Sequence, residues 1–462
     1  MSWALDLGST SLKCCGFDLG EAAPSVIEEF SLDCPLRQPK AGWVEHDLSG
    51  MADRFALLLQ RVPKGQTVVM ASAMHALVLL DGDGKPLCDA LSWADGRSAL
   101  QAEELQQSDP QAYARTGTPL HPMAWPAKLL WIAQERPQWW MRLRRVTDLK
   151  SFLWEKVTGQ VAPLDLSSAT GTGLWNRVRD GWDESLCERL QLNSELLPQV
   201  REGHRLVFQG RTLHLGGADG PLANLGVGAV GPGRLALSVG TSGAVRRYLA
   251  APHGVRQGLF LYALGQLGWV EGGAINNGGS VMSWLTDQIK LSVEDLFEAA
   301  QTVEPGAEGL RVYPYFLGER APFWRSDIQA RVVGKTDRHT WAHLARATLE
   351  GVAFCLQRLI RLMEETGSSE PLRCTGGMFS SSFWTQLLAD VTNREISSST
   401  VDQATALGAA LTTQADPLER SLALPLGPLV APRQAEVYRN LYDEWQEGEE
   451  EGLVSGGGIA EP

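Results

Sequence analysis

Two segments far apart in the chain carry the same pattern: a short apolar strand, a turn of glycine and hydroxyl residues, and a second strand. The first segment is 3–18, with its turn at 8–11, and the second is 234–245, with its turn at 240–243. Each pattern predicts a β-hairpin. Successive backbone N–H groups of such a turn can bind a phosphate. Two such turns favour two domains that face each other across one nucleotide.

An aspartate precedes each of these predicted turns in the sequence. Asp6 ends the first strand directly before its turn, where a carboxylate can hold a hydrated Mg²⁺. Asp219 follows two glycines and begins a helix of small residues, so it lies near a helix N-terminus with open space around it. Both have plain structural alternatives, since acid–glycine turns join strands in many proteins and Asp is a common helix N-cap.

Composition narrows the class of protein. The 462 residues are long for one hydrophobic core and favour two domains, and the apolar content of 44% is typical of a globular protein. A net charge of −13 argues against nucleic acid or an anionic membrane as partner. No apolar run reaches membrane-spanning length, no signal-peptide pattern opens the chain, and the seven scattered cysteines fit reduced thiols. We expect a cytoplasmic protein, and the sequence leaves open whether it forms a homodimer.

A further predicted strand, 67–71, runs into Met74 and His75. Ligands of α/β sheets gather at the carboxyl ends of strands, so both residues are candidates for a pocket. His75 has an alternative role as a buried, hydrogen-bonded histidine. The segment 165–170 is rich in small hydroxyl residues and suggests a loop that feeds a site, although helix capping alone explains it as well.

Taken together, these segments resemble the FGGY carbohydrate kinases, a family within the actin/hexokinase-like superfamily. The resemblance runs from Trp3 to about Leu411 and rests on motifs in the family's order, at 6–13, 42–47, 72–83, 93–98, 217–219, 240–243, 318–324 and 376–377. Within the family the chain is most similar to the gluconokinases, in the stretches 74–75, 121–123, 148–152, 167–171, 274–279 and 318–324.

The resemblance implies an α/β fold of two actin/hexokinase-like (ribonuclease H-like) ATPase domains with a nucleotide cleft between them. We place the N-terminal FGGY domain, with the sugar and phosphate side, at 1–225, and the C-terminal FGGY domain, with the nucleotide side, at 226–445. A long amphipathic helix is expected at about 340–365. The acidic and then glycine-rich segment 446–462 is expected to be a disordered tail.

The implied chemistry is transfer of the γ-phosphoryl group of ATP to a sugar hydroxyl, which depends on positioning and charge neutralisation. Asp219 is then the base for the attacking hydroxyl, on C6 if the substrate is gluconate, and Asp6 organises Mg²⁺ through water. The groups expected to hold the nucleotide belong to Gly8, Ser9, Thr10, Lys13, Gly240, Thr241, Gly279, Gly376 and Gly377.

The resemblance also assigns residues to the sugar. Met74 and His75 match the acceptor-binding pair of the family. The carboxylate of gluconate needs a cation or several hydrogen-bond donors, and Lys128 and Arg97 are the candidates. Arg97 has an alternative role as a structural partner of Asp95.

The chain departs from the family pattern at three places. Ser9 stands where the first turn more often has Thr, Val332 replaces a glycine that usually follows Ala-Arg, and the region beyond Thr413 is short. One pocket side chain can redirect a kinase of this fold, so xylulose, ribulose and glycerol stay open as substrates. A non-kinase actin-fold ATPase and a non-catalytic descendant also stay open, although intact Asp6 and Asp219 count against the latter.

Overall fold

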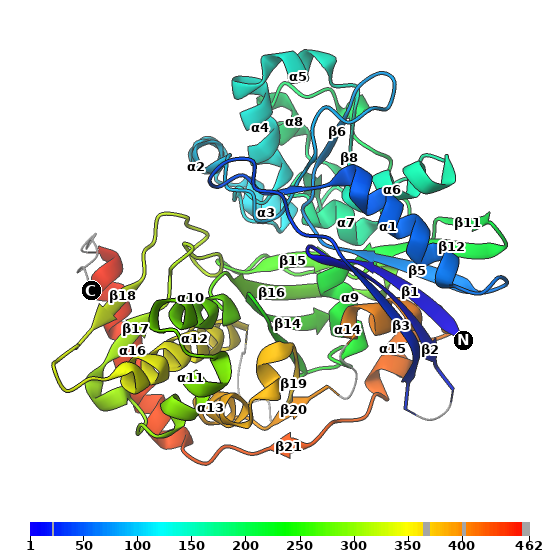
Figure 1. Ribbon diagram of the computed structural model, residues 1–462. Helices are drawn as coiled ribbons and strands as arrows, with labels where there is room; N and C mark the ends of the chain where they lie inside the picture. The colour runs from blue at the N-terminus through cyan, green and yellow to red at the C-terminus, as the bar shows by residue number, and fades with distance from the viewer. Residues whose placement is uncertain (21–22, 364–369, 400–402, 455–462) are drawn as a thin grey trace.

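The computed structural model describes residues 1–20, 23–363, 370–399 and 403–454. Two β-sheets that share one plan lie side by side in it (Figure 1). In each sheet, the first strand of a hairpin pairs antiparallel with the second strand and parallel with a strand from later in the chain. The sequence prediction of two hairpins in two α/β domains is confirmed.

The order of the strands shows the shared plan. The first sheet has the order β11 (Arg205–Phe208), β12 (Arg211–Ala218), β5 (Thr67–Ser72), β1 (Ser2–Leu7), β2 (Ser11–Asp18), β3 (Ser25–Asp33). The second has the order β15 (Phe260–Ala263), β16 (Trp269–Ile275), β14 (Gly243–Leu249), β13 (Leu235–Val239), β19 (Leu372–Thr375), β20 (Ile396–Ser398), β21 (Leu429–Val430). Each sheet therefore carries its hairpin turn at the end of a central strand.

Helices cover both faces of the first sheet, because its central strands are buried on both sides. α1 (Leu48–Arg61) and α6 (Leu149–Thr158) pack on one face. α9 (Asp219–Gly226) and α14 (Ala404–Leu411) pack on the other face, between the two sheets (Figure 1). α14 comes from the part of the chain assigned to the C-terminal domain, yet it contacts β1, β2 and β5 of the first sheet. The two domains thus share this helix pair.

A helical lobe with its own apolar cluster lies beside the first sheet (Figure 1). Its elements are β4 (Glu45–His46), β6 (Val78–Leu80), β7 (Ala90–Leu91), α2 (Ala99–Ser108), α3 (Ala112–Thr116), α4 (Trp125–Glu135), α5 (Pro137–Arg142), β8 (Arg145–Thr147), α7 (Leu166–Gly171), β9 (Trp175–Asn176), β10 (Gly181–Trp182) and α8 (Glu184–Arg189). The segment 165–170, which could have been a loop or a capped helix, is mostly the helix α7, and the side chain of Asp165 caps it by accepting from the Ser168 N–H at 2.9 Å.

The second sheet is covered by the helices and small strands of the C-terminal half. These are α10 (Gly279–Ile289), α11 (Val293–Gln301), β17 (Arg311–Tyr313), β18 (Arg331–Val333), α12 (Trp341–Met363), α13 (Ser382–Thr392) and α16 (Ala435–Val454). α15 (Pro417–Leu422) packs instead against α9 and α14. α12 matches the long helix expected at about 340–365, of which 364–365 lie outside the described residues. The seven cysteines are free thiols. No helix in the described ranges combines the length and apolarity needed to cross a membrane.

The prediction of a disordered tail from residue 446 is wrong for 446–454, which continue α16, whereas 455–462 lie outside the described residues. The acidic composition hides a buried stripe that runs at helical spacing from the preceding residues into this segment: Tyr438, Tyr442, Trp445 and Glu449 are each at most 2% exposed. Glu449 pairs with Arg358 of α12 and accepts the Tyr315 hydroxyl. The C-terminal helix is therefore part of the packed domain.

Candidate functional site

A cavity of about 440 Å³ lies between the two sheets and is lined by residues from both of them. Of the predicted site residues, those that line it are Asp6, Ser9, Lys13, Met74, His75 and Asp219. We call this cavity the interdomain cleft. It brings residues that are more than 200 positions apart in the sequence to one place, as the pattern of two facing hairpins predicted.

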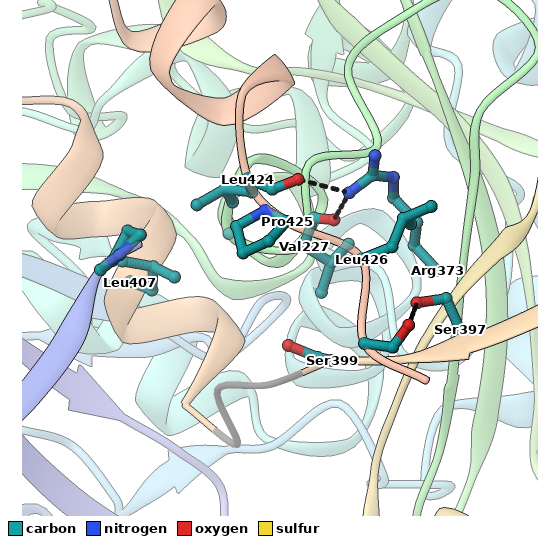
Figure 2. Close-up of a pocket in the computed structure, with 11 residues that line it drawn as sticks. Val227, Arg373, Ser397, Ser399, Leu407, Leu424, Pro425 and Leu426 are labelled. Carbon is teal, nitrogen blue, oxygen red and sulfur yellow. Dashed lines mark hydrogen bonds between the residues drawn. The ribbon is translucent and has the colours of Figure 1, made fainter. Parts of the chain in front are cut away.

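Another pocket, of about 20 Å³, lies beside β19 and β20 and is shown in Figure 2. The Arg373 guanidinium crosses it and donates to the carbonyl oxygens of Val227 at 3.1 Å and Leu424 at 3.4 Å. A volume of this size holds about one water molecule. The interdomain cleft is therefore the candidate site.

Asp6 lies at the end of β1, directly opposite Lys13 of β2 in the hairpin register. Its Oδ1 is buried and has no hydrogen-bond partner among the described residues. Burial raises the pKa of Asp6 to about 7, the charge of Asp219 adds to the rise, and the charge of Lys13 opposes it. A buried carboxylate oxygen without a donor fits a metal-bound water. No group of three or more His, Cys, Asp or Glu that could hold a metal by itself occurs in the described parts of the chain.

The first turn is held by contacts on both sides of it. A Cβ on Gly8 would lie 2.9 Å from the carbonyl oxygen of Ser11, so the tight turn favours glycine there. The Ser9 hydroxyl accepts from the indole Nε1 of Trp93 at 2.8 Å, and Thr10 is exposed at the tip. The Lys13 ammonium reaches into the cleft and donates to Gln403 Oε1 at 3.1 Å.

Asp219 is the first residue of α9, directly after β12. The strand is interrupted between His214 and Gly217, and Gly216 there has φ +67° with its Cα so close to β5 that a Cβ would lie 1.8 Å from the Met70 carbonyl oxygen. This irregularity directs the end of β12 into the cleft. One carboxylate oxygen of Asp219 accepts the Gly220 N–H at 2.8 Å, and burial raises the pKa of the group.

A buried chain of hydrogen bonds fixes the backbone before Asp219. The Lys150 ammonium donates to Asp165 at 2.6 Å, the Ser167 hydroxyl donates to Asp165 at 2.5 Å, and the Ala218 N–H donates to Ser167 Oγ at 2.7 Å. The hydroxyl-rich segment at 165–170 therefore both caps α7 and supports the site.

The second turn meets α10 and the end of β19. The Gly279 N–H donates to the Gly240 carbonyl at 2.7 Å, and the Ser280 N–H donates to the Thr241 carbonyl at 3.0 Å. Gly376 has φ +112°, and a Cβ there would lie 2.3 Å from the Val239 carbonyl oxygen. A Cβ on Gly377 would meet no atom within 4 Å. Four of the glycines predicted for the nucleotide side thus converge, three through close backbone contact and Gly377 as the chain neighbour of Gly376.

Met74 and His75 line the cleft at the carboxyl end of β5. His75 has φ +66°, and its Nδ1 lies 2.6 Å from the Gly171 carbonyl oxygen, which requires the proton on Nδ1. Burial lowers the pKa of His75 to about 3, so the ring is neutral. Its Nε2 is then a hydrogen-bond acceptor, which suits a sugar hydroxyl.

Arg97 and Lys128, the predicted carboxylate ligands, do not line the cleft. The Arg97 side chain is fully buried and pairs with Asp95 at 2.7 Å and Glu45 at 2.6 Å, so its structural alternative holds. The Lys128 ammonium donates to the carbonyl oxygens of His75, Leu91 and Ser92 at 2.8, 3.3 and 2.8 Å. Burial lowers the pKa of Lys128 to about 7. Lys128 thus fixes the backbone beneath His75 and has no donor left for a substrate.

Two arginines that the sequence reasoning did not select do line the cleft, Arg246 of β14 and Arg320. Strand alternation gives a signal for the first, because Arg246 lies two residues beyond Ala244 and so on the same face of the hairpin. Arg320 lies in the motif at 318–324, but only the folded structure shows that its side chain lines the cleft.

Comparisons with known proteins agree with this architecture. Residues 1–215 match the N-terminal domain, and residues 235–415 the C-terminal domain, of the FGGY family of carbohydrate kinases. The predicted boundary at 225/226 falls between the two matches and stays a prediction. A gluconokinase of Bacillus licheniformis is 31% identical over 443 residues, which cover 88% of this chain and 86% of that protein.

Two solved structures from Lactobacillus acidophilus, a ligand-bound xylulose kinase and a gluconate kinase, each superpose with a TM-score of 0.90. Each is 27% identical, and each match covers 98% of this chain and 99% of the other. The matched domains and the two paired sheets around the cleft both indicate the two-domain fold of this family. The chain belongs to the FGGY family of carbohydrate kinases.

Proposed function

We propose that this chain is an ATP-dependent kinase that converts D-gluconate to 6-phospho-D-gluconate. The observation that carries the proposal is the placement of Asp219 beside Asp6 in a cleft that both phosphate-binding turns border. Similarity to the Bacillus licheniformis gluconokinase and to the Lactobacillus acidophilus gluconate kinase supports the choice of acceptor.

Asp219 has the role of general base. Its raised pKa brings a carboxylate closer to the operating pH, which favours proton acceptance from an alcohol as its oxygen attacks. The oxygen of the C6 hydroxyl bonds to the γ-phosphorus, its proton passes to Asp219, and the bond from that phosphorus to the oxygen of ADP breaks. The Lys150–Asp165–Ser167 network keeps the base in line with the hydroxyl.

The residues around the two turns suit ATP. The N–H groups at Gly8, Ser9 and Thr10, with the Lys13 ammonium, would hold the γ-phosphate, and those of Gly240 and Thr241 the β- and γ-phosphates. Gly279, Gly376 and Gly377 would lie against the adenosine and the α-phosphate. The unpartnered Asp6 Oδ1 would hold Mg²⁺ through water. When bound, Mg²⁺ neutralises charge on the transferred phosphoryl group.

On the acceptor side, the neutral His75 would accept a hydrogen bond from a sugar hydroxyl at Nε2. Met74 packs beside it, since a Cβ on Gly171 would lie 2.3 Å from the Met74 methyl group. These contacts suit any polyol. They therefore favour a sugar or sugar acid but do not distinguish gluconate from xylulose, ribulose or glycerol.

Xylulose is the second candidate acceptor. The xylulose kinase of Lactobacillus acidophilus superposes with the same TM-score and identity as the gluconate kinase. All kinases of this fold would share the nucleotide half of the cleft. The residues at the acceptor end therefore determine which acceptor is phosphorylated.

The proposal is tested by ADP release from Mg-ATP with gluconate, xylulose, ribulose, glycerol or no acceptor. We expect the largest kcat/KM with gluconate and a rate without acceptor that is close to the blank. Turnover with xylulose alone would show that xylulose, not gluconate, is the acceptor, and the kinase assignment would stand. Acceptor-independent ADP release would favour a non-kinase ATPase of the same fold.

A further inference from the structure

Arg246 is a buried cation in the interdomain cleft that forms no ion pair with a carboxylate of the described residues. It is 8% exposed, and its one hydrogen bond within the described residues joins Nη2 to the Ser238 hydroxyl at 3.1 Å. Its Nε is buried without a partner in the described chain. Asp219 attracts it electrostatically but forms no ion pair with it within 4.0 Å. A guanidinium held in this way retains unused donors.

Arg320 is a second such cation in the same cleft. It is 9% exposed, lies over the Trp93 ring at 4.9 Å, and donates to Asn276 Oδ1 at 2.7 Å and to the Ile275 carbonyl at 3.0 Å. The oxygens of its neighbour Glu319 accept instead from Asn277 and from the backbone N–H groups of Asn276 and Arg320. Neither cleft arginine forms an ion pair with a described carboxylate.

A row of neighbouring side chains along one wall of the cleft connects Arg246 with His75. A Cβ on Gly272 would lie 2.8 Å from both Arg246 Cγ and Phe260 Cζ, so these two side chains flank the same glycine. Phe260 stacks on Tyr262 with ring centroids 4.3 Å apart, and Tyr262 meets the edge of His75 at 5.8 Å. Arg246 therefore belongs to the wall that also carries the acceptor-side aromatic rings.

The Cα of Arg246 lies further from the second turn than its guanidinium does. Val239 pairs with Gly243 next to the turn, whereas Arg246 pairs with Ala236, three residues further along β14, so its Cα lies roughly 10 Å from the turn. The side chain reaches back to the Ser238 hydroxyl, and its charge interacts with that of Asp219. An anion bound by Arg246 would thus lie in the cleft between the second turn and the aromatic rings.

Burying a guanidinium without an anion is costly, and a bound carboxylate would offset the cost through charge-assisted hydrogen bonds. We propose that Arg246, with Arg320 as a second cation, binds the carboxylate of a sugar-acid acceptor. The pair thereby selects aldonates over neutral polyols of the same length. This inference rests on the proposed kinase function and replaces Arg97 and Lys128 as the carboxylate ligands.

The test compares gluconate with D-glucitol, which has the same carbon chain but a neutral CH₂OH in place of the carboxylate. In Arg246→Gln, kcat/KM for gluconate should fall about 100-fold, chiefly through KM, as when one partner of a buried charge pair is removed. The KM for Mg-ATP and the activity with glucitol should change less than about threefold. Arg320→Gln should shift the same ratio in the same direction.

Arg211→Gln is the matched control. Arg211 is 7% exposed and, like Arg246, forms no ion pair with a described residue, but it donates to the Val62 carbonyl at 2.6 Å on the far edge of the first sheet. Its loss should lower stability and leave the gluconate-to-glucitol ratio unchanged. If Arg246→Gln does not fold, Arg246→Lys and Arg320→Gln carry the test through the same ratio.

The outcomes separate the two proposals. If the wild type phosphorylates gluconate and the gluconate-to-glucitol activity ratio is unchanged in both arginine variants, the proposed carboxylate site is wrong and the kinase assignment stands. A larger KM for Mg-ATP in Arg246→Gln would assign Arg246 to the nucleotide instead. Turnover of another aldonate but not of gluconate would overturn the acceptor and keep the carboxylate site, provided that the ratio for that aldonate falls in Arg246→Gln. Turnover of neutral polyols alone would overturn both.

Discussion

Asp6 and Asp219 lie in one cleft, and burial raises the pKa of both. We propose different roles for them because their contacts differ. Asp219 starts a helix and accepts a neighbouring N–H, whereas Asp6 ends a strand with an oxygen that no described donor satisfies. The arrangement of Asp219 suits a base that faces an alcohol, and that of Asp6 suits a carboxylate that binds a hydrated cation.

Removing the base should stop transfer without preventing nucleotide binding. In Asp219→Asn, which keeps the size of the side chain, kcat with gluconate should fall by about 10²–10⁴, the usual contribution of a general base. Calorimetric titration of Mg-ADP should give a Kd close to that of the wild type. Retention of more than a tenth of wild-type kcat would exclude Asp219 as the base.

Asp6 should make the nucleotide-free protein depend on pH in a defined direction. Its pKa in the folded protein is about 7, against the ordinary value of 3.8 for an aspartate, so the stabilising contribution of the neutral form is lost as pH rises from about 4 through 7. Asp6→Asn should therefore melt at a higher temperature than the wild type at pH 8. The difference should vanish near pH 4. Equal melting temperatures at both pH values would contradict the burial of this carboxyl.

Among the elements, α16 ties the C-terminus to the loop that carries Arg320. Glu449 is 2% exposed and pairs with Arg358, whose guanidinium lies over the Phe323 ring at 5.0 Å. Glu449→Ala should lower the free energy of unfolding by about 3–5 kcal/mol, since it leaves a buried cation unpaired. Glu447→Ala, at an exposed position of the same helix, is the matched control. Equal denaturation midpoints for the two variants would show that the pair contributes little.

The pair α9 and α14 is the other element on which the site depends. A Cβ on Gly408 would lie 1.8 Å from the Leu222 carbonyl oxygen, and one on Gly226 would lie 1.8 Å from the Ala404 carbonyl oxygen. Glycine to alanine usually stabilises a helix interior. Here Gly408→Ala should instead lower the free energy of unfolding by about 2 kcal/mol through overpacking. It should also lower kcat, because α9 begins with Asp219.

The control is Gly181→Ala, whose Cβ meets no atom within 4 Å. Chemical denaturation of both variants measures the difference. A Gly408→Ala protein as stable as the wild type would mean that the two helices are not held at this distance.

At the scale of the whole molecule, the two domains and their facing hairpins could be predicted because turn chemistry and motif order are local signals. The position of Asp219 in the cleft could be predicted for the same reason. The cations could not: Arg97 and Lys128 have the required charge, but Arg97 pairs with Asp95 and Lys128 donates to backbone carbonyls, which keeps both out of the cleft. The buried stripe of α16 was hidden by acidic composition, which a count at helical spacing would have revealed.

In the complex that we propose, the cleft holds gluconate with its C6 hydroxyl at Asp219 and its carboxylate at Arg246. The most direct measurement is the ³¹P and ¹³C NMR spectrum of the product formed from gluconate and Mg-ATP. We predict 6-phosphogluconate and ADP in equal amounts, with no other phosphorylated carbon. Phosphate on a different carbon would contradict the orientation, and inorganic phosphate as the product would contradict the kinase assignment itself.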